Sequence, residues 1–283
     1  MSIRHLLLSM IAVLTLLALG IGAREVLNTR ERLAAIDWLE HSNHVSGLVQ
    51  RASGALARER GITTIALSRP DWRADDAART TQTNDALRSE ADAHIAALVA
   101  ETPNTARLAP DHPLVSQLAG IRALHSELQT YRDAVDASLA GIVVDLDIAP
   151  QRWVALVSNF IDVLHQTISI TASPAPGGGS ASVQPLIRDA LFTLAEHLGQ
   201  ERAIIAAALS REAQLGPTEL RELEHYRANI LHTWKRADGL LDDFERTPQI
   251  EAAIDRFWTG LFVHYEDLRD SVVTAGERGQ PYP

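Results

Sequence analysis

Apolar side chains recur at intervals of three and four residues along most of the chain, and prolines and glycines interrupt this spacing at intervals. Such spacing places apolar side chains on one face of an α-helix. Sustained alternation of apolar and polar residues, the pattern typical of a β-strand, is absent from the sequence. We therefore expect an all-α fold. The predicted helices cover residues 24–68, 74–101, 112–140, 150–172, 183–213, 217–246 and 248–275.

The N-terminal stretch differs from the rest because residues 6–23 contain no charged side chain. A run of this length is just sufficient to cross a bilayer as a helix. A cleaved signal peptide is the alternative, since Ala18-Leu19-Gly20 has the small residues of a cleavage site. The run is longer than a usual signal core, and the helical pattern continues past it. We therefore expect residues 1–23 to be a retained anchor in a bacterial inner membrane, with the remainder in the periplasm.

An internal repeat relates the two halves of the chain. Residues 59–69 read ERGITTIALSR and residues 201–211 read ERAIIAAALSR, so that seven of eleven positions are identical at an offset of 142. Self-similarity at this period indicates a duplicated unit of about four helices. We expect a stalk and first bundle in residues 24–172, a Pro- and Gly-rich linker in 173–182, and a second bundle in 183–283.

The second unit is shorter than the first by about one helix. In the first unit, a short loop after Gly141 leads to a fourth helix that begins near Pro150. In the second unit, a similar loop follows Gly276, but no counterpart of that helix comes after it. We therefore expect two tandem up-and-down bundles, of which the second lacks its last helix. An open apolar groove would result.

Composition and charge exclude several classes of protein. The chain has no cysteine, which excludes disulfides and Cys-ligated metal sites. Its formal charge of −10 argues against a nucleic-acid-binding protein, and it means that an anionic ligand must be held by a local basic cluster. We find no phosphate-binding loop, nucleophile motif or complete metal-ligand set. We therefore expect no enzyme activity, no cofactor and no metal.

Arginines in the repeat are the candidate ligand-binding residues. Arg60 and Arg202 occupy equivalent positions, each in line with the apolar stripe of its helix. A guanidinium group offers coplanar donors that match a planar oxyanion. A buried arginine needs an anionic partner, and both a ligand and a carboxylate of a facing helix are open alternatives. Thr63, one turn from Arg60, could donate a hydroxyl. Arg58 is a weaker candidate because its helix face is expected to be solvated.

Short motifs identify a family resemblance that covers most of residues 40–283. They are LVQRASGALARERGITTIALS at residues 48–68, with Glu59-Arg60-Gly61 and Thr63, then Gln200-Glu201-Arg202, and Trp153 with Ile161-Asp162. Together these motifs resemble the nitrate- and nitrite-sensing (NIT) domains of bacterial receptors. The resemblance implies two four-helix bundles and arginines that bind nitrate or nitrite. Family members tend to carry an arginine four residues before an aspartate in the second helix, whereas Asp85 has Thr81 at that position.

Two functional hypotheses follow from these observations. In the first, the protein is an extracytoplasmic sensor that binds nitrate or nitrite, and a change in bundle packing reaches the membrane through the first helix. Its juxtamembrane segment, residues 24–40, would pair in a homodimer. In the second, the protein is a ligand-free anchored scaffold whose incomplete second bundle accepts a partner helix. Pairing of both Arg60 and Arg202 with protein carboxylates favours the scaffold, and convergence on an open pocket favours the sensor.

Overall fold

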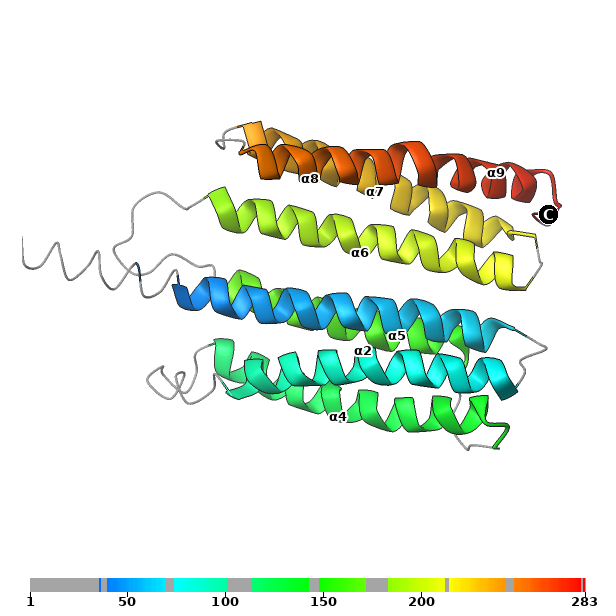
Figure 1. The fold of residues 1–283 in the computed structure, drawn as a ribbon, viewed down its shortest axis with the longest axis horizontal. Helices are drawn as coiled ribbons and strands as arrows, with labels where there is room; N and C mark the ends of the chain where they lie inside the picture. Colours follow the sequence, from blue (N-terminus) through cyan, green and yellow to red (C-terminus); the bar gives the residue numbers. More distant parts are fainter. Residues whose placement is uncertain are drawn as a thin grey trace, which may run out of the picture. The chain divides into compact units, whose positions relative to one another are not determined.

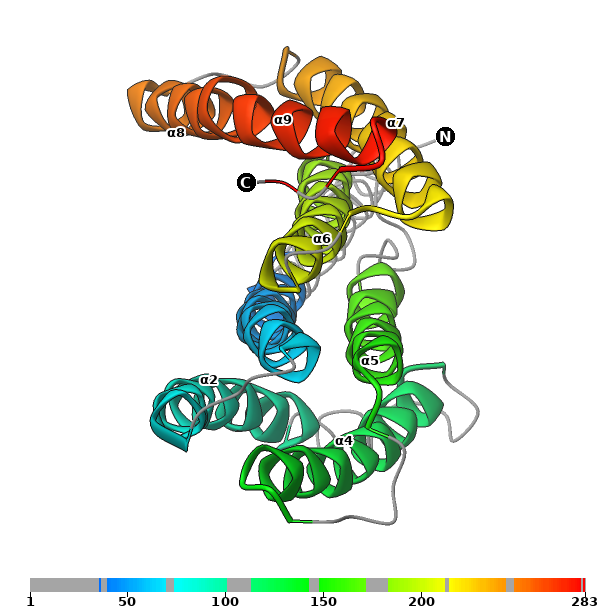
Figure 2. The same ribbon diagram turned by 90° about the vertical axis from the view of Figure 1, so that its right-hand side faces the viewer.

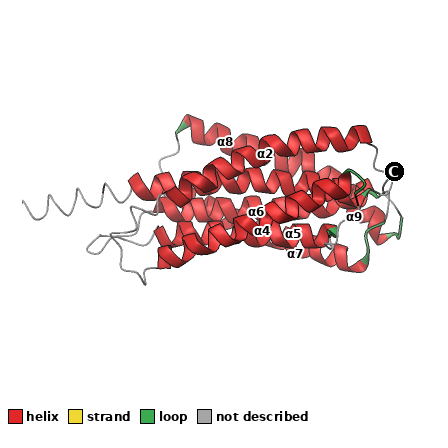
Figure 3. Cartoon of the chain, turned by 90° about the horizontal axis from the view of Figure 1, so that it is seen from below, coloured by secondary structure: helices red, strands yellow, loops and turns green. Residues whose placement is uncertain are grey.

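The computed structural model describes residue 36 and residues 40–69, 74–100, 113–142, 148–171, 183–211, 214–242, 247–280 and 282. All regular secondary structure in these residues is helical, which confirms the predicted all-α class for this part of the chain (Figures 1 and 3). The predicted anchor in residues 6–23 lies outside the described residues. Within them, no helix is long and apolar enough to cross a membrane.

Four helices build the first half. They are a helix over residues 40–68, α2 (Ala74–Ala100), α4 (Pro113–Leu139) and α5 (Pro150–Thr171). Pro113 and Pro150 begin α4 and α5, where a proline costs no helical hydrogen bond because the first N–H groups have no partner in the helix. After α4, Gly141 adopts a φ of 77°, and the Ile142 N–H donates to the Ala137 carbonyl oxygen. This left-handed glycine ends the helix.

One apolar core joins these four helices. The helix over residues 40–68 contributes Val45, Val49, Ala52 and Leu56, all at the spacing that the sequence indicated. Trp153, from α5, is fully buried and donates from Nε1 to the Arg60 carbonyl oxygen at 3.2 Å. Helix α5 therefore covers the face of the 40–68 helix on which Arg60 lies. The other buried apolar residues are Ala55, Ala91, Ile95, Leu98, Leu114, Leu118, Ile121, Leu128, Val135, Val157, Phe160, Ile161, Leu164 and Ile168.

The second half contains α6 (Val183–Ser210), α7 (Pro217–Asp242), α8 (Pro248–Trp258), the π-helix η1 (Thr259–Tyr265) and α9 (Glu266–Glu277). Helices α8, η1 and α9 follow one another directly, where the sequence predicted one α-helix. Two small apolar clusters replace a single core, one around Leu223 and Val272 and one around Leu194 and Ile230. Within the described residues, no further helix follows α9.

Residues 45–171 and 182–283 belong to one compact unit, so both helical groups are part of it. In the end-on view, the 40–68 helix and α6 lie side by side, and an ion pair between Arg60 and Glu196 joins them (Figure 2). The division of the chain into two separate bundle domains stays a prediction.

Candidate functional site

Arg60 lies where the 40–68 helix faces α6, and its side chain is 1% exposed. Its Nη1 donates to Glu196 Oε1 at 2.5 Å, and its Nη2 donates to Glu196 Oε2 at 3.2 Å. Nη1 also donates to Ser158 Oγ at 2.7 Å. A planar guanidinium therefore meets a planar carboxylate in the two-pronged geometry that arginine favours. This pair links the first half of the chain to α6, and we call it the junction pair.

A glycine on α6 makes the junction pair possible. A Cβ atom on Gly199 would lie 2.9 Å from Arg60 Nη2, closer than real Cβ contacts allow. On the same helix, Gln200 Nε2 donates to Glu196 Oε1 at 2.7 Å and so orients the carboxylate. Arg60 Nε is buried and has no hydrogen-bond partner among the described residues. The two Nη atoms of the Arg60 guanidinium therefore make all of its described hydrogen bonds, and Nε makes none.

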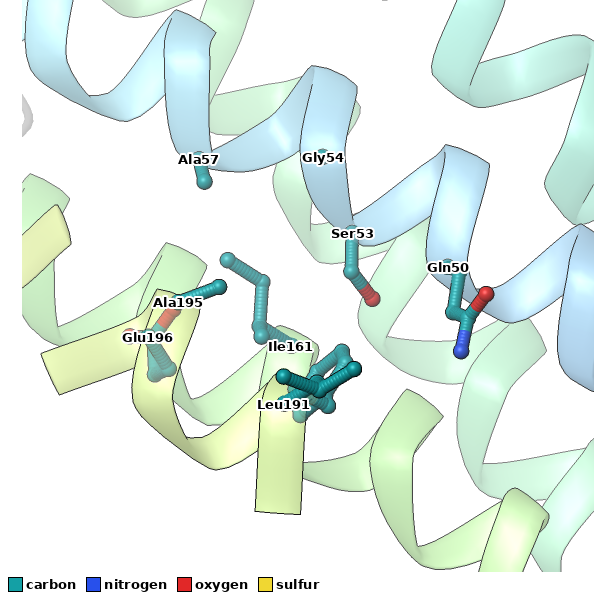
Figure 4. A pocket seen from close by; sticks show the side chains of 9 residues that line it. Gln50, Ser53, Gly54, Ala57, Ile161, Leu191, Ala195 and Glu196 are labelled. Carbon is teal, nitrogen blue, oxygen red and sulfur yellow. The ribbon is translucent and has the colours of Figure 1, made fainter. Parts of the chain in front are cut away.

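A cavity of about 300 Å³ adjoins the junction pair (Figure 4). Small residues of the two helices, among them Gly54, Ala57 and Ala195, leave this space open, and Glu196 forms part of its wall. Ser53 also lines it, and in the described structure its buried hydroxyl makes no hydrogen bond. The cavity thus combines an unused hydroxyl group with a carboxylate that already holds an arginine.

Asp162 and His197 lie near Glu196, and His165 lies near Asp162. Burial and the negative charge of Glu196 raise the pKa of Asp162. Burial also lowers the pKa of His165 and that of His197, which keeps both rings neutral near pH 7. Arg60 is therefore the cation that balances the Glu196 carboxylate, and a second carboxyl group lies close by.

A separate ionic network fills part of the first core. The carboxylate of Glu59 is fully buried and accepts hydrogen bonds from Arg88 Nε at 2.8 Å and from Arg132 Nε at 2.9 Å and Nη2 at 2.6 Å. Arg88 is also paired with Asp136, and Arg132 with Asp92. Although burial opposes the change, hydrogen bonds from His125 and Arg132 lower the pKa of Asp92 to about 2. Because its charges are paired within the protein, we assign this network to stability.

The second half has a reduced version of this network. Glu201, the repeat equivalent of Glu59, is fully buried, and its Oε1 accepts a hydrogen bond from Arg269 Nε at 2.6 Å. Burial and the charge of Glu201 raise the pKa of Tyr265, whose hydroxyl therefore stays protonated. The acidic residue of the ERG/ERA motif is thus buried in both halves.

The arginine of the second motif behaves differently from its counterpart. Arg202 was expected in line with the buried stripe of its helix, but its side chain is exposed, and that expectation was wrong. The reason is that α5 covers Arg60, whereas no described helix covers the corresponding face of α6. Arg202 instead lines a second cavity, of about 610 Å³, together with Arg256. In the part of the chain that the structure describes, no carboxylate lies within 4.0 Å of its guanidinium.

The structure does not bring the other two candidates to the junction pair. Thr63 is fully buried, and its Oγ1 accepts a hydrogen bond from Asn84 Nδ2 at 2.9 Å in the first core. Arg58 is exposed and pairs with Glu90 at 2.8 Å, as expected for a solvated face. Of the four arginine and threonine candidates, Arg60 alone belongs to the junction pair.

Comparison with known proteins agrees with these features. A family model for nitrate and nitrite sensing (NIT) matches residues 52–282. The chain belongs to the NIT family. No curated protein and no solved structure matched the chain. In α2, Arg88 lies four residues before Asp92, and both belong to the ionic network around Glu59.

Sequence reasoning missed the carboxylates of this NIT protein. Glu59 and Glu201 are identical in the two repeat motifs, so the signal for a buried pair was present and was assigned to the neighbouring arginines instead. Glu196 has no such signal, because the repeat places Gly54 at the equivalent position. Only the packing of α6 against the 40–68 helix identifies Glu196 as the partner of Arg60.

Proposed function

We propose that this NIT protein senses nitrate or nitrite by binding the anion on Arg60 in place of Glu196. The observation that carries the proposal is the junction pair itself. A buried guanidinium is held across two helices by a single carboxylate, beside a cavity with an unused hydroxyl group. Membership of the family supplies the class of ligand.

Nitrate resembles the Glu196 carboxylate as an acceptor for the Arg60 guanidinium. Nitrate and a carboxylate are both planar monoanions with oxygen acceptors, so nitrate satisfies the same two Nη donors of Arg60. The cavity of about 300 Å³ has ample room for so small an anion. Ser53 contributes a hydroxyl group to the bound anion. Glu196 then turns away and stays hydrogen-bonded to Gln200.

Arg202 adds a second positive charge. Arg202 lies about one helical turn after Gly199, the residue of α6 that the Arg60 guanidinium approaches. Among the described residues, no carboxylate neutralises the charge of Arg202. We propose that its charge attracts the anion without replacing Arg60 as the main ligand. Removal of Arg202 is therefore expected to weaken binding severalfold, and removal of Arg60 to abolish it.

The junction pair connects the 40–68 helix to α6, and this connection suggests how a signal is transmitted. When the anion displaces Glu196, the direct link between the 40–68 helix and α6 is lost, so ligand binding changes the relative stability of two packing arrangements. The 40–68 helix lies nearest in the sequence to residues 6–23, which we propose form a membrane anchor. We also propose a homodimer with its ligand-binding part outside the cytoplasm. No catalytic step is part of this proposal.

Calorimetric titration of the full chain in detergent micelles with nitrate, nitrite, chloride and sulfate tests the proposal. We expect nitrate or nitrite to bind with clear preference. Arg60→Ala should abolish the binding. Glu196→Gln should tighten it about tenfold, because a neutral amide competes less well for the guanidinium.

Arg58→Ala is the matched control, since Arg58 lies two residues away on the same helix but is exposed and paired with Glu90. Its affinity for nitrate should equal that of the wild type. Circular dichroism establishes that each variant is folded. Absence of nitrate and nitrite binding by the folded wild type, or unchanged binding by Arg60→Ala, would refute the proposed site.

A further inference from the structure

We propose that the groove between α6 and the α8–η1–α9 segment binds one amphipathic, acidic helix of a partner protein. This inference is independent of nitrate binding. It rests on the repeat, on two cavities along α6, and on the charge of the residues that line them.

The repeat identifies the kind of occupant. In the first half, α5 packs against the 40–68 helix and α4, and its Trp153 and Ser158 contact Arg60. The repeat makes α6 the counterpart of the 40–68 helix, and the α8–η1–α9 segment follows as the counterpart of α4. The position that α5 takes in the first half is vacant of any described helix in the second half. A helix is therefore the element that fits the groove.

The dimensions of the groove match this occupant. One cavity, of about 450 Å³, begins at Ile187, and the second, of about 610 Å³, extends to Leu209, with Phe257 lining both. From Ile187 to Leu209, α6 is about 33 Å long at the usual helical rise. Helix α5, with 22 residues, has the same length.

The surface of the groove is apolar and partly exposed. Leu191, which lines the first cavity, is 42% exposed, and Leu268, which lines the second, is 39% exposed. Large exposed apolar side chains along one groove are typical of a binding surface. Gly260, in η1, lines the second cavity, and a Cβ atom added there would meet nothing within 4 Å.

The charge of the lining specifies an acidic occupant. Arg202 and Arg256 line the second cavity, which has no aspartate or glutamate among its described lining residues. Arg256 Nε donates to the Ala252 carbonyl oxygen of its own helix, which leaves its terminal nitrogens for a partner. A chain of net charge −10 thus presents a basic groove. Complementary charge selects partners in this way.

Synthetic peptides test the proposal on the full chain in detergent micelles. The probe is the α5 sequence, residues 148–171, labelled with fluorescein, because α5 fills the corresponding groove. An acidic form carries Arg152→Glu, and a basic form carries Asp162→Lys. We expect fluorescence anisotropy to show that the acidic form binds at least tenfold more tightly than the basic form. Arg256→Glu in the protein should remove this difference.

Two controls locate the bound peptide and separate this result from the nitrate proposal. Arg221→Glu, at an exposed α7 residue that bonds only within its own helix, should leave both affinities unchanged. The chain has no cysteine, so Gly260→Cys provides a single thiol that should form a disulfide with a cysteine-bearing acidic peptide. Nitrate should still bind Arg256→Glu, at worst with the affinity of Arg202→Ala, because Arg60 is intact, and this keeps the two hypotheses distinguishable.

Several outcomes would overturn the proposal. They are the absence of peptide binding to folded protein, the same affinity for both peptides, and crosslinking of Gly260→Cys chains to one another in preference to the peptide. The last outcome would identify a second copy of the chain as the occupant of the groove.

Discussion

Glu59→Gln is the substitution that most directly tests the ionic network in the first core. The carboxylate is fully buried and receives three hydrogen bonds from Arg88 and Arg132, of which Arg132 is only 2% exposed. Glutamine preserves the shape and one acceptor oxygen, but it removes the charge. Two guanidinium groups then depend on Asp92 and Asp136, which are about one-third exposed.

The expected cost follows from these contacts. Removing one partner of a buried ion pair typically destabilises a protein by about 3 to 5 kcal/mol. The retained acceptor and the two aspartates reduce this cost, so we expect a loss of about 3 kcal/mol in the free energy of unfolding. Arg132→Gln should lower the free energy of unfolding less in the Glu59→Gln protein than in the wild type. In the Glu59→Gln protein, the arginine that is removed has already lost its charged partner.

Urea denaturation of the full chain in detergent micelles, followed by circular dichroism, measures these free energies. Glu90→Gln is the control, since Glu90 pairs with Arg58 at the surface, and it should change the stability by less than about 0.5 kcal/mol. A loss below 1 kcal/mol for Glu59→Gln, or additive effects of Glu59→Gln and Arg132→Gln, would show that the network does not stabilise the core.

Three further predictions concern other parts of the molecule. Gly199→Ala should lower the melting temperature because its Cβ atom would displace the Arg60 guanidinium, whereas Gly120→Ala, with nothing within 4 Å of the added atom, should raise it slightly. Glu201→Gln should destabilise the protein, but by less than Glu59→Gln, since a single arginine loses its partner; parallel urea titrations compare them. The lowered pKa of Asp92, about 2, stabilises the folded state above its ordinary pKa of 3.8, and this contribution is lost as the pH falls toward 2. Asp92→Asn should therefore reduce the stability by about 1 kcal/mol at pH 6 and hardly at pH 2, as measured by urea titration at both values.

The helices were predictable because the sequence marks their ends. Pro113, Pro150 and Pro217 begin helices, and Gly141 ends one with a positive φ. The π-helical turn after Trp258 was not predictable. A π-helix has about one more residue per turn than an α-helix. Over the seven residues of η1, this difference shifts the apolar positions too little to be recognised in the sequence, which therefore indicates a continuous α-helix.

The burial of Arg60 was predictable, whereas its partner was not. A core-facing stripe can be identified from spacing within one helix, but a contact between the 40–68 helix and α6 depends on how the two halves pack. Arg202 illustrates the same limit. Its position along the helix matches that of Arg60, but burial also requires a covering helix, and the described structure supplies one only for Arg60.

The glutamate and the arginine of the repeated dipeptide differ in how they are packed in the two halves. The glutamates, Glu59 and Glu201, are identical, fully buried and paired with arginines of the helices opposite them, so each half needs its glutamate in order to pack. The arginines are also identical, but Arg60 is enclosed and Arg202 is exposed. Since the same residue type is kept in two environments with different packing demands, packing alone does not account for it. The role that we propose for them, attracting an anion to the junction of the two halves, is compatible with both environments.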